Sequence, residues 1–129
     1  MARKAISAPG AATVGPYSQA VDADGLVFLS GQTPIDPATG TLLLGDIGAR
    51  TERCFLNLFA VLTAAGLSPD DVQKVNVFLT DMKDFAAMNA VYKTQFREPY
   101  PARSTIGVAS LPLGSDIEIE LIARRPGGR

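Results

Sequence analysis

The chain has 129 residues, a formal net charge of −1, no histidine and one cysteine. This length suits one domain, which we expect to span residues 1–129. The charge balance provides no basic field that attracts phosphates, so we expect no binding to nucleic acid or to an anionic membrane. Without histidine or a cysteine cluster we expect no metal site, and any catalysis must use carboxylates, arginine, hydroxyls, backbone groups and water.

The cysteine content and the lack of long apolar runs predict a cytoplasmic protein. The single cysteine, Cys54, cannot form an internal disulfide and sits in an apolar helical pattern, which suits a reducing compartment. No uninterrupted apolar run reaches the length of about 18 residues that a membrane span needs, and the N-terminal segment has no signal-like apolar run.

The first part of the chain predicts a hairpin followed by a loop. The segment from Ala20 to Ser30 reads as two strands around the turn Asp24-Gly25, because Asp-Gly between β-rich runs is a strong hairpin signal. Proline, glycine and aspartate are dense from Gln32 to Gly45, which predicts a long surface loop.

The middle of the chain predicts a helix and a strand. A helix is expected from Asp46 to Ala65, stopped by Gly66, and its apolar face is formed by Cys54, Leu58, Val61, Leu62 and Ala65. The run VQKVNVFLT then places valine and leucine alternately on one side, which is the pattern of a strand with one buried face.

The last part of the chain predicts a second helix and two strands. The helix is expected from Asp84 to Arg97, because apolar residues recur every three or four positions and Pro99 prevents continuation. PARSTIGVASLP reads as a strand that ends in a turn at residues 112–115, and DIEIELIA reads as the final strand with isoleucine and leucine on one face.

With two helices and about six strands, the chain predicts an α+β two-layer sandwich: a mixed, six-stranded sheet with both helices on one face. In the strand that follows Gly25, Val27 and Leu29 point to one face while Leu26 and Phe28 point to the other. Both sheet faces are therefore partly apolar, and we expect a partner subunit to cover the face without helices.

Arg103 stands at the head of a predicted strand and has more than one interpretation. Its guanidinium can lie along the sheet edge in water, or form an ion pair with Glu118, since a short turn joins their two strands. The functional interpretation is that the rigid strand end holds the planar guanidinium in a cleft, where it binds a small carboxylate with two hydrogen bonds.

Glu118 also has two interpretations. It can belong to an exposed polar face together with Glu120, because the two alternate with isoleucine and leucine along the final strand. In a cleft, the same carboxylate can hold a water molecule or pass a proton to a nitrogen leaving group.

Four further positions are candidate binding residues, each with a structural alternative. Tyr17 can be a rim aromatic, and Ser30 ends a strand. Gly31 permits either a tight turn or the close approach of a ligand. Asn89 lies beside the apolar stripe of the second helix, where a buried amide needs hydrogen-bond partners.

Together these segments resemble a known family. PARSTIGVASLP followed by IEIELIA is similar to the C-terminal signature of the RidA family, also called the YjgF family, of enamine and imine deaminases. GPYSQAV, FLSGQTPIDPATG and the block from AAGLSPDD to MNAVY also resemble family segments in family order, so the resemblance covers nearly the whole chain.

The resemblance implies a fold, an assembly and an activity. The expected fold is chorismate-mutase-like, assembled as a homotrimer with clefts between subunits. The expected activity is hydrolysis of 2-aminoacrylate and related enamines or imines, released by pyridoxal-phosphate enzymes, to 2-oxo acids and ammonia, without metal or cofactor. Arg103 then binds the substrate carboxylate and Glu118 places the attacking water, while Tyr17, Ser30, Gly31 and Asn89 fall on cleft positions.

This sequence departs from the family pattern at one position. Many members have cysteine two places after the arginine, where this chain has Thr105, so thiol chemistry is excluded there. We expect Thr105 to bind the substrate through its backbone N–H. Two other functions remain open at this stage: a non-catalytic trimer that binds a 2-oxo acid or similar carboxylate as a regulator, and RNA binding, which the charge balance disfavours.

Overall fold

The computed structural model describes residues 3–9 and 15–127, and a six-stranded sheet forms its centre. The strands lie in the order β1-β2-β3-β8-β6-β7, and only the pair formed by β6 and β7 is parallel. Their bounds are β1 Lys4–Ile6, β2 Ala20–Ala23, β3 Leu26–Gln32, β6 Val72–Leu79, β7 Ala102–Gly107 and β8 Ile117–Arg124.

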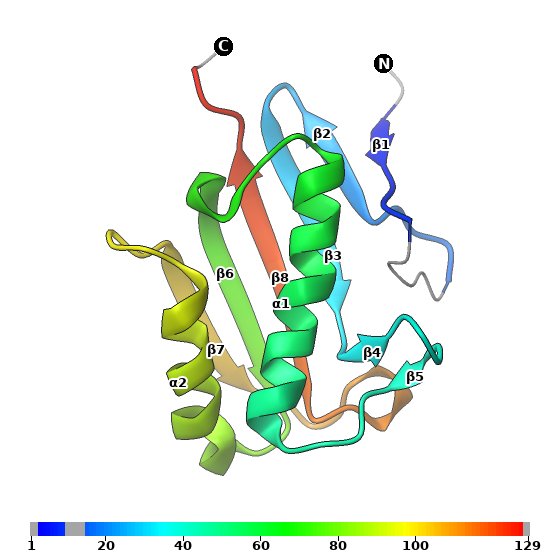
Figure 1. Ribbon diagram of the computed structural model, residues 1–129, viewed down its shortest axis with the longest axis vertical. Helices are drawn as coiled ribbons and strands as arrows, with labels where there is room; N and C mark the ends of the chain where they lie inside the picture. The colour runs from blue at the N-terminus through cyan, green and yellow to red at the C-terminus, as the bar shows by residue number, and fades with distance from the viewer. Residues whose placement is uncertain (1–2, 10–14, 128–129) are drawn as a thin grey trace.

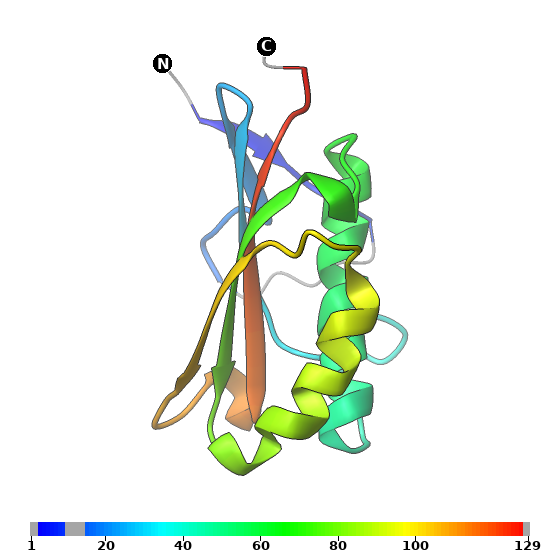
Figure 2. The ribbon, with the colours of Figure 1, turned by 90° about the vertical axis from the view of Figure 1, so that its left-hand side faces the viewer.

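Two helices cover one face of this sheet. The helix α1 spans Ile47–Ala64 and α2 spans Phe85–Gln95. Both lie on the same side of the sheet, and Figure 2 shows them as one layer with the sheet as the other (Figures 1 and 2). The predicted α+β two-layer sandwich is confirmed. None of the described helices is long and apolar enough to cross a membrane.

The ends of α1 follow from local chemistry. The Asp46 carboxylate accepts a hydrogen bond from the backbone N–H of Ala49 at 2.9 Å, which satisfies one of the free donors in the first turn. At the other end Gly66 has a φ of 77°, a left-handed conformation that glycine adopts without strain. The predicted helix from Asp46 to Ala65 is thus confirmed, with Asp46 as its cap.

The core lies between the helices and the sheet, mainly against β8 and its neighbour β6. In β8 and β6, alternate residues have at most 1% of their surface exposed, and they pack against the buried face of α1. Phe55 of α1 contacts the rings of Tyr92 and Phe96, with centroids 5.8 and 5.6 Å apart. Such edge-on aromatic pairs stabilise the contact between α1 and α2 beyond their buried area. The buried strand residues are Val75, Val77, Leu79, Ile117, Ile119 and Leu121.

The hairpin turn between β2 and β3 is tied to the last described segment of the chain. Asp24 and Gly25 have φ values of 54° and 93°, as the predicted Asp-Gly turn requires. Arg125 Nε donates to Asp22 Oδ2 at 2.8 Å, and its Nη1 donates to the Ala65 carbonyl at 2.6 Å. The scattered arginines at this end of the sequence, Arg124, Arg125 and Arg129, predict a solvated end. This is wrong for Arg125, because it joins the hairpin, α1 and β8, while Arg129 lies outside the described residues.

The segment from Gln32 to Gly45 differs from the predicted surface loop. It begins inside β3 and forms a small separate hairpin, β4 Ile35–Asp36 with β5 Thr41–Leu42. Gln32, Thr33 and Ile35 are buried. The cause is the buried amide of Asn57 in α1, which donates to the carbonyl oxygen of Ile35 at 2.9 Å and so fastens this segment against the helix.

The sheet face without helices carries large apolar side chains. Phe28 and Ile106 are 43% and 48% exposed, and Phe28 stands opposite Ile122 in the pairing of β3 with β8. On the neighbouring strands Phe78 pairs with Ile106. Both faces of the sheet are thus partly apolar, as the sequence predicted, and the open face suits contact with another protein surface.

Candidate active site

Arg103 lies on the helix-covered face of the sheet. It is the second residue of β7 and pairs with Val75 of β6, which is fully buried beneath the helices. From there its side chain reaches α2, where Nη1 donates to Asn89 Oδ1 at 2.7 Å. The expected partner for the Asn89 amide is therefore the Arg103 guanidinium.

Two aromatic rings hold the guanidinium of Arg103 from α2. Its central carbon lies 4.5 Å from the centroid of Tyr92 and 5.5 Å from that of Phe85. A guanidinium over the face of an aromatic ring is stabilised by the ring quadrupole. In the described part of the chain no carboxylate pairs with Arg103. The guanidinium is therefore oriented while its charge is not neutralised, which suits a group that binds an anionic ligand.

Thr105 lies two residues further along β7, on the same face as Arg103. Its hydroxyl is buried and makes no hydrogen bond in the structure. Because β7 is an edge strand, its backbone pairs only with β6 and half of its N–H and C=O groups face away from the sheet. Thr105 thus offers both a hydroxyl and an edge-strand backbone beside Arg103.

Glu118 lies on the opposite, open face of the sheet. It is the second residue of β8, between Ile117 and Ile119, whose side chains are fully buried on the helix side. Burial raises the pKa of the Glu118 carboxyl, and the nearby Glu120 carboxylate raises it further. Among the described residues Glu118 has no hydrogen-bond partner, whereas Glu120 accepts from Asn76 Nδ2 at 2.9 Å. Glu120 is thus a structural residue, and Glu118 is available for chemistry.

A bulge in β3 brings Gly31 against Glu118. Leu29 pairs with Leu121 and Gln32 pairs with Ile119, so Ser30 and Gly31 together stand opposite the single residue Glu120. A β-carbon at Gly31 would lie 2.9 Å from Glu118 Cδ and closer still to Oε2. Glycine is therefore needed for the Glu118 carboxylate to lie over this strand. This close approach, not a tight turn, is the role of Gly31.

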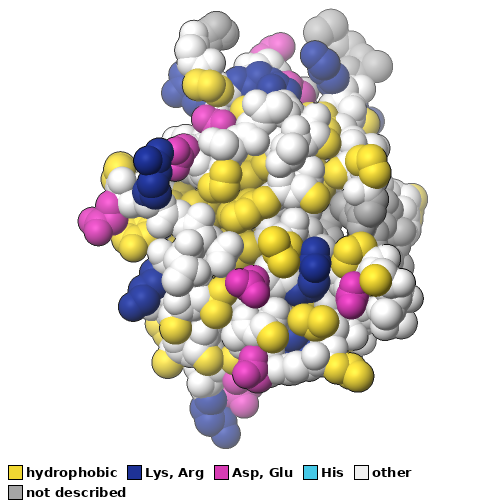
Figure 3. All heavy atoms as spheres, in the orientation of Figure 1, with side chains coloured by type: hydrophobic (Ala, Val, Ile, Leu, Met, Phe, Trp, Pro, Cys, Tyr) yellow, Lys and Arg dark blue, Asp and Glu magenta, His cyan; other side chains and the backbone are white. Residues whose placement is uncertain are grey.

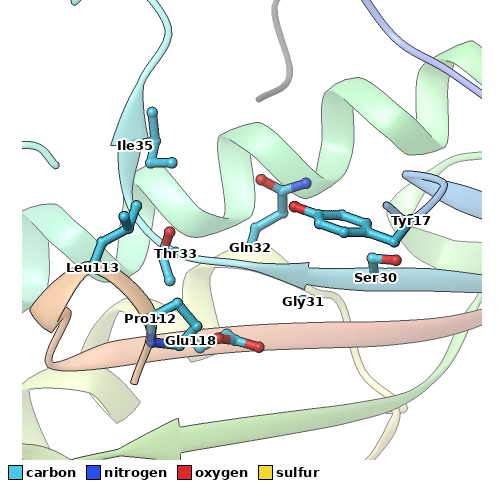
Figure 4. Close-up of a pocket in the computed structure, with 9 residues that line it drawn as sticks. All are labelled: Tyr17, Ser30, Gly31, Gln32, Thr33, Ile35, Pro112, Leu113 and Glu118. Carbon is cyan, nitrogen blue, oxygen red and sulfur yellow. The ribbon is translucent and has the colours of Figure 1, made fainter. Parts of the chain in front are cut away.

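Tyr17, Ser30, Gly31 and Glu118 line one hollow of about 300 Å³ (Figure 4). The Ser30 hydroxyl donates to the Ser18 carbonyl at 2.6 Å, which fixes the segment that carries Tyr17 beside β3. The remaining walls come from the end of β3, the start of β4 and the 3-10 turn before β8, which the sequence interpretation left out of the site: Gln32, Thr33, Ile35, Pro112 and Leu113.

The seven predicted site residues thus form two groups. The arginine half-site consists of Asn89, Arg103 and Thr105, and the glutamate half-site consists of Tyr17, Ser30, Gly31 and Glu118. Within one chain the two cannot meet, because β6 lies between β7 and β8 and the half-sites occupy opposite faces of the sheet. The alternative interpretation of Arg103 as the ion-pair partner of Glu118 is therefore wrong.

Comparison with known proteins identifies the family. The family model described as Endoribonuclease L-PSP matches residues 5–125. The chain is 45% identical over 122 residues to the Mus musculus protein named 2-iminobutanoate/2-iminopropanoate deaminase, covering 94% of this chain and 90% of that protein. The chain belongs to the RidA family. Protein DfrA of Myxococcus xanthus is another similar protein and is 51% identical over 126 residues. The match covers 95% of this chain and 96% of DfrA.

Solved RidA-family structures have the same fold. The crystal structure of RidA from an Antarctic Psychrobacter bacterium is 46% identical, with a TM-score of 0.90 over 95% of this chain and 99% of its own. The structure of E. coli TdcF with bound serine is 43% identical, with a TM-score of 0.88 over 95% and 98% of the two chains. The predicted family and fold are thereby confirmed.

The sequence interpretation missed two features of this RidA-family site, and only the first of them was accessible from the sequence. Phe85, Asn89 and Tyr92 are spaced by four and three residues, so they share one helical face, and this spacing was assigned only to core packing. Nothing local marked Leu113 as a pocket residue, because its position depends on the loop that precedes β8. Among the described residues no group of three potential metal ligands occurs.

Proposed function

We propose that this chain hydrolyses enamines and imines of the 2-aminoacrylate type to 2-oxo acids and ammonia. Three lines of support are independent of one another: the named deaminase relatives, an oriented guanidinium, and a desolvated carboxylate, the last two without an ion-pair partner among the described residues. The last two are the groups that this reaction needs, one to hold a small anion and one to handle water and protons.

Arg103 binds the substrate carboxylate in this proposal. Asn89 and the ring of Tyr92 fix the plane of the guanidinium, so its remaining N–H groups are presented as a preformed fork. Thr105 adds its backbone N–H and its unpaired buried hydroxyl beside that fork. The substrate is thereby held in one orientation, which supplies much of the rate increase for a reaction that already proceeds in water.

Glu118 places the attacking water in this proposal. An enamine first becomes the imine by taking a proton at its terminal carbon and losing one from nitrogen. Water then adds to the carbon of the protonated imine while Glu118 takes one of its protons, which gives a neutral carbinolamine. Glu118 returns that proton to the nitrogen, ammonia leaves as the C–N bond breaks, and the hydroxyl group loses its proton to solvent to form the 2-oxo acid. A raised pKa brings the Glu118 carboxyl closer to the pH at which both proton acceptance and donation are efficient. Metal ions and cofactors have no part in this sequence of steps.

The proposed assembly rests on one observation: the two half-sites lie on opposite faces of the sheet. We propose that a complete cleft forms when the arginine half-site of one chain meets the glutamate half-site of a neighbour in a homotrimer. The apolar side chains on the open sheet face, Phe28 and Ile106 among them, support such a contact. The expected solution mass is three times the 13.6 kDa of one chain, and a stable lone protomer would contradict the assembly.

The activity is tested by coupling a serine or threonine dehydratase to the purified protein and measuring the rate of 2-oxo acid appearance. We expect acceleration by the wild type and none by the Arg103→Ala variant. Equal acceleration by both proteins would show that Arg103 does not bind the substrate. Absence of any acceleration, with retention of a small carboxylate ligand, would favour the alternative function of a non-catalytic metabolite-binding regulator.

The family description includes the word endoribonuclease, but two observations weigh against RNA as the substrate here. The net charge is −1, and on the helix-covered face basic and acidic side chains are interspersed (Figure 3). Neutralising a phosphate backbone requires clustered Lys and Arg side chains. A salt-dependent gel shift at modest protein concentration would contradict our proposal that nucleic acid is not a partner.

The cytoplasm remains our prediction for the location of this protein, consistent with the buried free thiol of Cys54.

A further inference from the structure

The hollow beside Glu118 has two chemically different ends. Figure 4 shows Tyr17 and Ser30 at one end, and Leu113 and Ile35 at the other. The first end carries hydroxyl groups, whereas the second is apolar. The whole hollow has a volume of about 300 Å³, which is at the lower limit for small-molecule sites. This is more space than a substrate with a methyl side chain fills.

Leu113 is the unusual residue at the apolar end. Its φ of 62° and ψ of 17° are left-handed, a conformation that is unfavourable for a residue with a β-carbon. Glycine or asparagine adopts this conformation more readily. The Leu113 side chain is also 55% exposed, so burial within its own chain does little to offset that cost. The fold of the chain therefore gives no reason for leucine at this position.

Strained residues in sparsely populated backbone conformations cluster at functional sites. We propose that Leu113, together with Ile35 and Pro112, forms a subsite for the carbon side chain of the substrate. This inference rests on the proposed function, because Glu118 at the same hollow marks where the reacting carbon lies. The chemical class it selects is 2-imino acids with an apolar side chain of about four carbons, such as the imine of leucine.

The test compares two imines produced in situ by an amino acid oxidase, one from alanine and one from leucine, with semicarbazide as the competing trap. The variants are Leu113→Asn and Leu113→Gly, because both residues fit the left-handed backbone and so preserve the loop. The measured quantity is the kcat/KM for the leucine-derived imine divided by that for the alanine-derived imine. We expect this ratio to fall by about three- to tenfold in both variants. The effect is smaller than in an enclosed hydrophobic pocket, because Leu113 forms a wall that is half exposed.

The matched control is Leu44→Asn, since Leu44 is 91% exposed and does not line this hollow. Its substrate ratio is expected to equal that of the wild type. An unchanged ratio in both Leu113 variants, with a wild type that hydrolyses both imines, would overturn the subsite and leave the proposed function standing. A wild type that accelerates neither reaction would remove the proposed function and the subsite with it. Dissociation of the Leu113 variants to a smaller species would instead identify Leu113 as a subunit contact and overturn the inference.

Discussion

The two half-sites are held in different ways. Arg103 is fixed from three directions by α2: Asn89 accepts its hydrogen bond, and the rings of Phe85 and Tyr92 lie against its guanidinium. Glu118 has no hydrogen-bond partner among the described residues, and its position depends on the space left by Gly31 and on partial burial. The arginine half-site is therefore ordered by contacts, whereas the glutamate half-site is ordered by the shape of the sheet.

This difference matches the two tasks in the proposed reaction. A binding group loses least entropy when it is already oriented, so contacts that fix Arg103 favour affinity. A group that exchanges protons needs a pKa near the working pH and unoccupied lone pairs, so contacts that satisfied Glu118 would reduce its use. Substitutions in the first half-site should therefore act on binding and on kcat/KM, and those in the second on kcat and pH dependence.

The largest effect is expected for Arg103. Loss of two charge-assisted hydrogen bonds of about 2 kcal/mol each predicts that Arg103→Ala lowers kcat/KM by about a thousandfold. Arg103→Lys keeps the charge but not the planar fork, and should remain about a hundredfold below the wild type. The coupled dehydratase assay measures both, with Arg124→Lys, an exposed arginine, as the control. Full activity in Arg103→Lys would show that charge alone suffices.

Glu118→Gln should lower kcat by about a hundredfold with little change in KM, because an amide accepts no proton from water.

Glu118→Gln should also raise the melting temperature at neutral pH. A carboxyl whose pKa is raised in the folded state contributes stability at low pH, and that contribution is lost as the pH rises through the folded-state pKa. The ionised form of Glu118 is therefore destabilising at neutral pH. Calorimetry checks this, with exposed Glu52→Gln as the control. A lower melting temperature would refute the desolvation argument.

Gly31→Ala should lower kcat by about tenfold, because the new β-carbon displaces the Glu118 carboxylate and small displacements of a catalytic group are costly. Gly48→Ala is the control: its β-carbon would lie 3.4 Å from Asp46 Oδ1 and 3.7 Å from Val91 of α2, which are ordinary contacts. That variant should have wild-type activity and a slightly higher melting temperature. Wild-type kcat in Gly31→Ala would mean that the carboxylate is not held by this close approach.

Glu120→Gln should have the smallest effect, visible only in the pH profile. Glu120 raises the pKa of Glu118, so neutralising it should lower that pKa. If the ionised form of Glu118 activates water, kcat falls as the pH drops through its pKa, and this acidic limb should move to lower pH in the variant. If the acidic side of the kcat profile stays in place or moves to higher pH, the titrating group is not Glu118.

The sequence was sufficient for both helices and for most strands of the sheet, because these follow from local patterns. The roles of the site residues follow from the family resemblance and stay predictions. Asp24-Gly25, the stripe of α1 and the alternation of β8 each determine their own element. The separation of Arg103 from Glu118 did not follow, since it depends on β6 entering the sheet between β7 and β8. Likewise, the composition of residues 32–45 predicted a surface loop, but residues 32–35 are buried, and the amide of Asn57 on a distant helix holds them against the fold.

The most direct test of the divided site mixes two inactive chains. Co-expression of Arg103→Ala and Glu118→Gln chains in equal amounts places an intact arginine half-site against an intact glutamate half-site in about a quarter of the clefts of randomly mixed trimers. We predict about a quarter of the wild-type activity from the mixture, although each variant alone is nearly inactive. No gain of activity in oligomers shown by mass spectrometry to contain both chains would contradict a cleft shared between subunits.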